Sequence, residues 1–188
     1  MTLLTVGIAL FCLLHLVPAM QPQFREDLHG KLGENAYRGL FSLLIVGSLV
    51  VIVFGWKSAS PTHVYVPPLQ SGPLASVLIL AGLVLFFAAQ TNGNIKRIVR
   101  HPQMTGTMLW GIAHLLLNGD SRSVALFGSL TVWALLEIVL INRRDGAWEK
   151  PGPAGLKNDL IPVVAGVVVF GAIMHFHATL FGVSAYPS

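Results

Sequence analysis

Six stretches of the sequence are apolar enough to enter a lipid bilayer as helices, and this feature constrains the fold most strongly. The hydrocarbon core of a bilayer is about 30 Å thick, so a spanning helix needs about 20 mainly apolar residues. The stretches cover residues 2–20, 39–56, 73–90, 102–117, 123–141 and 160–183. None of them alternates like a membrane strand. The sequence therefore predicts an all-α integral membrane bundle of about six transmembrane helices.

Composition supports a lipid environment and excludes several other classes of protein. Hydrophobic residues make up 54% of the chain and charged residues only 11%, whereas soluble domains average about 25% charged residues. The net charge of +4 does not indicate nucleic-acid binding, because the basic residues flank the apolar stretches. We expect a single domain over residues 1–188, with the lipid bilayer as its main partner.

The basic residues predict the orientation of the bundle. Ten of the twelve lie in three of the five loops: Arg25, Lys31, Arg38, Lys96, Arg97, Arg100, Arg143, Arg144, Lys150 and Lys157. Only Lys57 and Arg122 lie in the other two loops. Because loops rich in lysine and arginine remain in the cytoplasm, we expect both termini to lie outside it.

The first basic loop carries its own apolar pattern. Phe24, Leu28, Leu32 and Ala36 recur every four residues among charged side chains, which predicts a short helix lying in the interface plane. The last basic loop, residues 143–159, is rich in proline, glycine and charge, which is typical of an irregular linker.

Ionisable side chains inside apolar stretches are costly, so each of them is a candidate functional residue. The candidates are His15, His114, Glu137, His175 and His177. We expect Glu137 to reach the interface or to pair with a basic residue such as Arg143 or Arg100. His175 and His177 are two positions apart, point away from each other on a helix, and are expected at the outer interface.

His15 and His114 lie deepest in their predicted helices. Small residues one turn away, such as Gly111 beside His114, leave a flat slot next to each imidazole. Two neutral imidazoles that project into one slot can bind a haem iron axially; alternatively, each hydrogen-bonds a neighbouring helix. Their depths differ by roughly 8 Å at 1.5 Å per residue. Helix tilt or a break near Pro18 could close that difference; otherwise His101 is the rival ligand.

Two motifs carry a resemblance to a known family. Residues 97–120 read RIVRHPQMTGTMLWGIAHLLLNGD, and residues 32–42 read LGENAYRGLFS. They resemble the signature of the NnrU family, multi-pass proteins of the bacterial inner membrane that are linked to denitrification and nitric oxide metabolism. The family also includes the plant and cyanobacterial zeta-carotene isomerase, which shares the RHPQM start and an Ala-His pair thirteen residues later. Length and helix number fit the family along the whole chain.

The resemblance implies a cofactor and its ligands. In the isomerase, haem b is held by one histidine in the first helix and one in the helix after RHP, and those positions match His15 and His114. The implied function is redox or sensing chemistry of nitric oxide. From their charge and expected depth, and not from the resemblance, we expect Arg38, Arg97 or Arg100 to hold the haem propionates at the cytoplasmic face.

Two alternatives to this function remain open. The first is a haem-dependent cis-trans isomerase of an apolar polyene, although the adjacent histidines of the family isomerase are missing here, where Leu135, Leu136 and Glu137 stand. The second is a haem-free membrane assembly factor in which the histidines are structural. Nothing in the sequence indicates the oligomeric state.

Overall fold

The computed structural model describes residues 1–185, and the regular elements in that range are helices. They are α1 (Thr2–Met20), α2 (Pro22–Leu32), α3 (Glu34–Ser58), α4 (Gly72–Ala88), the 3₁₀ helix η1 (Asn94–Arg97), α5 (Pro102–Leu117), α6 (Ser121–Ser123), the π-helical turn η2 (Val124–Gly128), α7 (Ser129–Asp145) and α8 (Lys157–Phe181). The predicted all-α class is confirmed.

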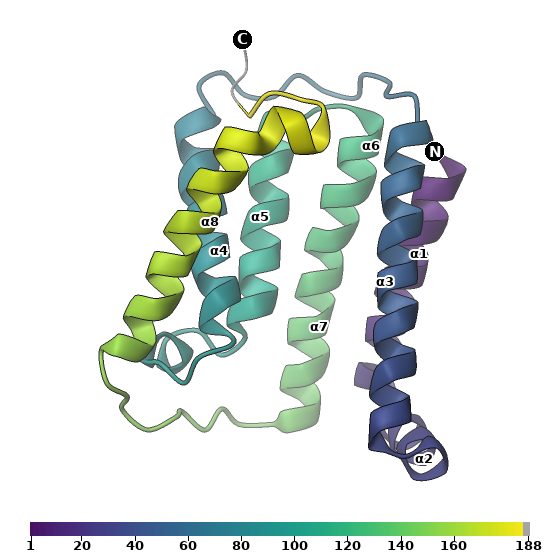
Figure 1. The fold of residues 1–188 in the computed structure, drawn as a ribbon, viewed down its shortest axis with the longest axis vertical. Coiled ribbons are helices and arrows are strands. Elements are labelled where there is room, and N and C mark those ends of the chain that lie inside the picture. Colours follow the sequence, from purple (N-terminus) through teal and green to yellow (C-terminus); the bar gives the residue numbers. More distant parts are fainter. Residues whose placement is uncertain (186–188) are drawn as a thin grey trace.

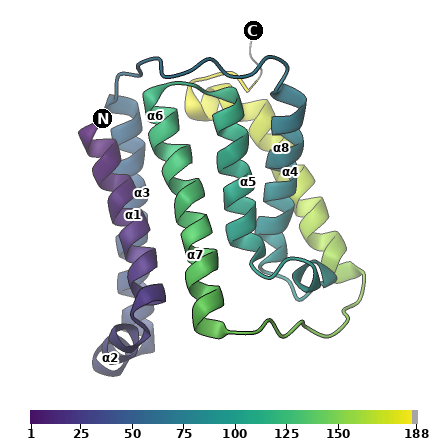
Figure 2. The same cartoon turned by 180° about the vertical axis from the view of Figure 1, so that it is seen from behind.

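The long helices form two groups with α7 between them. Figure 1 shows α1 beside α3 on one side of α7, and α4, α5 and α8 on the other side. The view from behind in Figure 2 shows the same order. α7 contacts both α1 and α5, so it is the element that joins the two groups. It continues directly from α6 and η2, so that Ser121–Asp145 forms one helix of 25 residues.

Four helices are long and apolar enough to cross a membrane: α1, α3, Ser121–Asp145 and α8. The helix α4 is a shorter apolar helix of 17 residues, and α5 has 16 residues. At 1.5 Å per residue these two reach only about 25 Å. Helices therefore form at all six predicted stretches, but only four of these helices are long enough to cross a membrane. The count of six spans and the outside location of both termini stay predictions.

Apolar side chains cover much of the surface, as expected for helices in contact with lipid. Leu43 is 68% exposed, and Val168 on α8 is 62% exposed. The buried core is small and includes a cluster of Leu4, Ile8 and Ile52 between α1 and α3. Because few apolar side chains are covered by protein, a bilayer is needed to cover the rest.

Two local predictions are corrected by the helix boundaries. The helix α1 continues through Pro18 to Met20, so the predicted break near Pro18 is wrong. The interfacial helix ends at Leu32 rather than extending to Ala36, because Gly33 follows with a φ of 78°, a backbone conformation that ends a helix and favours glycine. Figure 1 shows α2 lying across the ends of α1 and α3, as the interface-plane prediction requires.

The loop between α3 and α4 closes one end of the bundle. The Tyr65 hydroxyl reaches the carbonyl oxygens of Leu115 and Asn118, and Ser71 Oγ donates to Leu116 O at 2.7 Å. These bonds satisfy carbonyl groups at the end of α5 that have no partner within the helix. The last turn of α5, which contains His114, is therefore held in place from outside the helix.

Candidate functional site

His15 lies in an aromatic cluster where α1 faces α7 and α3. Its ring centroid lies 4.4 Å from that of Phe11, 5.1 Å from that of Trp133 and 5.7 Å from that of Phe41. Phe11 precedes His15 by one helical turn, so these two side chains share a face. Trp133 comes from α7 and is 5% exposed. The His15 ring is therefore held in place by aromatic side chains from three helices.

His114 lies one turn before the end of α5, in a second aromatic cluster. Its ring is 4.4 Å from that of Phe127 and 4.7 Å from that of Trp110. The chain approaches η2 closely here, because a Cβ on Gly111 would lie 2.9 Å from the carbonyl oxygen of Phe127. The slot expected beside His114 is therefore not open, because the space next to Gly111 is filled by the Thr131 side chain and the Phe127 carbonyl.

The two histidines make the same hydrogen bond. Nδ1 of His15 lies 2.8 Å from the Phe11 carbonyl oxygen, and Nδ1 of His114 lies 2.8 Å from the Trp110 carbonyl oxygen. A carbonyl only accepts, so Nδ1 carries the proton in both rings. The lone pair of each neutral ring is then on Nε2, which makes no hydrogen bond to any residue in 1–185. This is the arrangement of histidines that ligate metals.

The structure does not bring His15 and His114 together. Trp133, which contacts His15, and Phe127, which contacts His114, are six residues apart on one helix, about 9 Å along its axis at 1.5 Å per residue. The helices that carry the two histidines lie on either side of α7 (Figure 2). The depth difference inferred from the sequence is therefore present in the structure.

The rival ligand His101 has a different environment. Its Nε2 lies 2.9 Å from Oδ1 of Asn142 on α7. Because an amide oxygen accepts, Nε2 of His101 carries a proton and is not available as a ligand in this arrangement. The bond links the start of α5 to the last turns of α7. His101 therefore links two helices in this structure, and its role as rival ligand stays a prediction.

The three arginines predicted to bind propionates lie near one end of the bundle. Arg97, in η1, has a buried Nε with no hydrogen-bond partner among the described residues. Arg38 forms an exposed ion pair with Glu34 at 2.6 Å, three residues before Phe41, which contacts His15. Arg100 donates to the Gly146 carbonyl oxygen at 2.9 Å. Within residues 1–185, the polar contacts of Arg38 and Arg100 are with Glu34 and Gly146, and neither arginine contacts His15 or His114.

Glu137 departs from its predicted environment. It is 5% exposed, and its Oε1 has no hydrogen-bond partner among the described residues. It forms no ion pair with Arg143 or Arg100 among the described residues, so these two residues are not its partners in this structure. Nε1 of Trp133, one turn earlier, is likewise buried without a partner. The rotation of α7 that places Trp133 against α1 also turns Glu137 into the protein.

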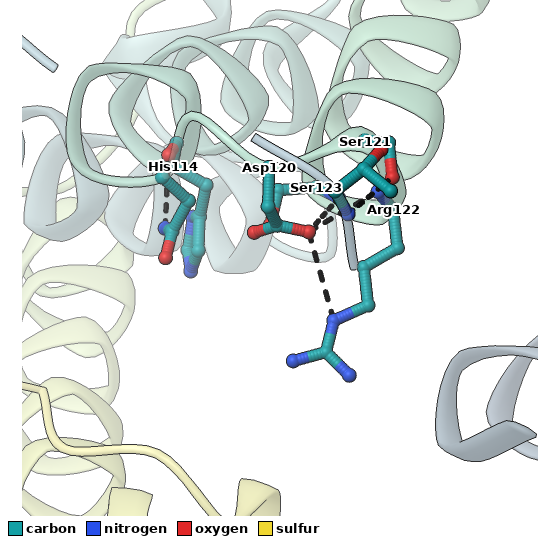
Figure 3. Close-up of polar contacts among 7 residues, drawn as sticks. His114, Asp120, Ser121, Arg122 and Ser123 are labelled. Carbon is teal, nitrogen blue, oxygen red and sulfur yellow. Dashed lines mark hydrogen bonds and ion pairs between the residues drawn. The ribbon is translucent and has the colours of Figure 1, made fainter. Parts of the chain in front are cut away.

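A polar turn, residues 118–120, follows α5. From the sequence it was predicted only as the end of a helix. Figure 3 shows Asp120 at the start of α6, with its carboxylate accepting from the backbone of Arg122 and Ser123, each at 3.1 Å. The Arg122 guanidinium lies 4.6 Å from the centre of the Trp56 ring. An open pocket of about 460 Å³ lies beside this turn, lined by residues that include His63 and Asp120.

These features define an integral membrane protein with two separate histidine centres inside a helical bundle. No group of three or more histidine, cysteine, aspartate or glutamate residues placed to hold a metal occurs within residues 1–185. The family model described as NnrU protein matches residues 3–185, and the chain belongs to the NnrU family. No curated protein and no solved structure gives a significant match.

Proposed function

We propose that this chain binds haem b inside the membrane, with His15 and His114 as iron ligands, and acts in redox or sensing chemistry of nitric oxide. One observation carries the proposal: both rings donate from Nδ1 to the carbonyl oxygen four residues earlier and leave Nε2 free. Bound haem supplies an iron for electron transfer or for binding nitric oxide. The chain supplies the ligands and the aromatic side chains that exclude water.

Each ring fits the role of a ligand, but the present packing separates the pair. Two nitrogen ligands of one metal, each about 2 Å from it, must come within about 4 Å of each other. The aromatic neighbours of the two rings are about 9 Å apart along α7. Ligation of one iron by both histidines therefore requires the segment between Phe127 and Trp133 to repack, and haem loading should change tryptophan fluorescence.

The test is the absorption spectrum of the purified chain after expression with excess haem. We expect a Soret band, one haem per chain and a six-coordinate spectrum. His15→Ala and His114→Ala should each abolish that spectrum. His175→Ala is the control, because His175 also lies on α8 but has an exposed side chain, and its ring contact is with Phe176.

Three outcomes would contradict the proposal. Absence of a Soret band would leave the haem-free alternative, and an unchanged spectrum in both alanine variants would exclude the two ligands. Loss of the spectrum in His101→Ala alone would favour the rival ligand.

The isomerase alternative has less support, since Leu135 and Leu136 are 50% and 45% exposed on α7 where the family isomerase has histidines. Supplying cis zeta-carotene to the haem-loaded chain tests it directly.

A further inference from the structure

A groove with almost entirely apolar walls lies between α1, α2 and α3. Its volume is about 350 Å³, and it is lined by apolar side chains from all three helices, among them Leu13, Val17, Leu28, Leu32, Leu40 and Leu44. The groove lies at the end of the bundle where α2 crosses α1 and α3 (Figure 1). In a bilayer such a groove is filled by a hydrocarbon chain, because the contact of apolar walls with water is unfavourable.

Arg25 is the one charged residue that lines this groove. It takes part in none of the ion pairs formed within residues 1–185. Glu26 and Asp27, the next two residues of α2, do not line the groove. The groove thus combines apolar walls with an unpaired guanidinium on the helix that lies in the interface plane, where lipid phosphates are found.

We propose that this groove binds one phospholipid that carries a net negative charge. An acyl chain lies against α1 and α3, and the phosphate accepts hydrogen bonds from Arg25, whose planar guanidinium suits phosphate oxygens. A zwitterionic lipid matches the site less well, since its ammonium group repels an arginine that has no acidic partner. This proposal does not require haem, because neither His15 nor His114 lines the groove, although Phe41, which contacts His15, does.

Native mass spectrometry of the full chain in detergent tests the proposal. Dioleoyl phosphatidylglycerol and dioleoyl phosphatidylcholine are titrated separately. We expect a single bound phosphatidylglycerol with an affinity about fivefold higher than that of phosphatidylcholine, the upper range for an exposed charge pair. Arg25→Gln should remove this preference, so that the two lipids bind with equal affinity.

Lys31→Gln is the matched control, because it removes the same charge from the same helix outside the groove lining. It should retain the preference for phosphatidylglycerol. Leu28→Trp narrows the groove and should weaken binding of both lipids, with unchanged helicity by circular dichroism.

Three results would overturn the proposal. The first is equal affinity of the native chain for the two lipids. The second is an equal loss of the preference for phosphatidylglycerol in Lys31→Gln and in Arg25→Gln. That result would indicate diffuse electrostatic attraction of the lipid to α2 instead of a binding site. The third is displacement of phosphatidylglycerol by β-carotene, which would make the occupant a polyene.

Discussion

Tyr65 is a single residue through which the loop between α3 and α4 stabilises the end of α5. Its hydroxyl faces two carbonyl oxygens of that end, those of Leu115 and Asn118, the latter at 3.0 Å. Burial raises the pKa of Tyr65 above its ordinary value, and the nearby Asp120 carboxylate raises it further. The neutral hydroxyl, which can donate, is therefore the form that the folded chain stabilises.

Tyr65→Phe should lower the free energy of unfolding by about 1 kcal/mol, the usual net contribution of one hydrogen bond. The measurement is thermal unfolding in detergent, and Tyr37→Phe is the control, because no residue in 1–185 hydrogen-bonds the Tyr37 hydroxyl. Since the folded pKa is raised, the contribution of Tyr65 is complete below the unfolded pKa of about 10 and is lost as the pH rises through the folded pKa. The difference between native chain and Tyr65→Phe should therefore shrink above about pH 10. If the free energies of unfolding of the native chain and of Tyr65→Phe differed by the same amount at every pH, this account would be contradicted.

The residues that could be predicted from the sequence are those fixed by position along one helix. His15 and His114 stand out as polar residues in apolar stretches, and Phe11 and Trp110 lie on their faces because they are one turn away. Their neighbours across the interface, Trp133 and Phe127, depend on how α7 is rotated. A uniformly apolar helix carries little information on its rotation, which is also why the burial of Glu137 could not be predicted.

At the scale of elements, the pair of α1 and α3 is held together by direct backbone contact. A Cβ added to Gly55 of α3 would collide with the backbone of Leu4 on α1, and a Cβ on Gly7 would lie 2.8 Å from the Ile52 nitrogen. Small residues that let helix backbones approach are the usual means of packing in membranes, where apolar burial gives little advantage. Gly47, also on α3, faces open space instead.

Gly55→Ala should therefore destabilise the bundle by about 1–3 kcal/mol, the cost of inserting a methyl group into a close contact. Gly47→Ala is the matched control, with the same substitution in the same helix and no atom within 4 Å of the new Cβ. It should leave stability unchanged or raise it by about 0.5–1 kcal/mol, since glycine disfavours a helix interior. Thermal unfolding of both variants in detergent is the measurement. An equal loss in both would show that α1 and α3 do not pack through Gly55.

Helix positions were more predictable than helix contacts. The bounds Thr2–Met20 and Pro102–Leu117 coincide with the predicted stretches, because hydrophobicity and proline mark them directly. The central place of α7 between two groups of helices was not predicted. It arises from tertiary packing, and α7 resembles the other apolar helices in its sequence.

For the whole molecule, the uneven distribution of charge predicts one orientation in the membrane. Figure 1 places α2, η1 and the linker between α7 and α8 at the same end of the bundle. These segments and their flanks carry the ten basic residues of the three basic loops. The loop between α3 and α4 lies at the opposite end, where α1 begins. The structure thus gathers the basic residues on one side, and the positive-inside rule assigns that side to the cytoplasm.

Cysteine labelling in spheroplasts tests this orientation. In a Cys12→Ala background, which removes the one native cysteine, Leu69→Cys places a thiol in the loop between α3 and α4 at a position that is 94% exposed. Glu149→Cys places one in the exposed linker between α7 and α8. A membrane-impermeant maleimide should label Leu69→Cys in intact spheroplasts and Glu149→Cys only after detergent is added, because the basic end stays on the cytoplasmic side. Labelling of both after detergent is the control for thiol accessibility. Labelling of Glu149→Cys in intact spheroplasts would reverse the orientation and would place the groove beside Arg25 in the outer leaflet.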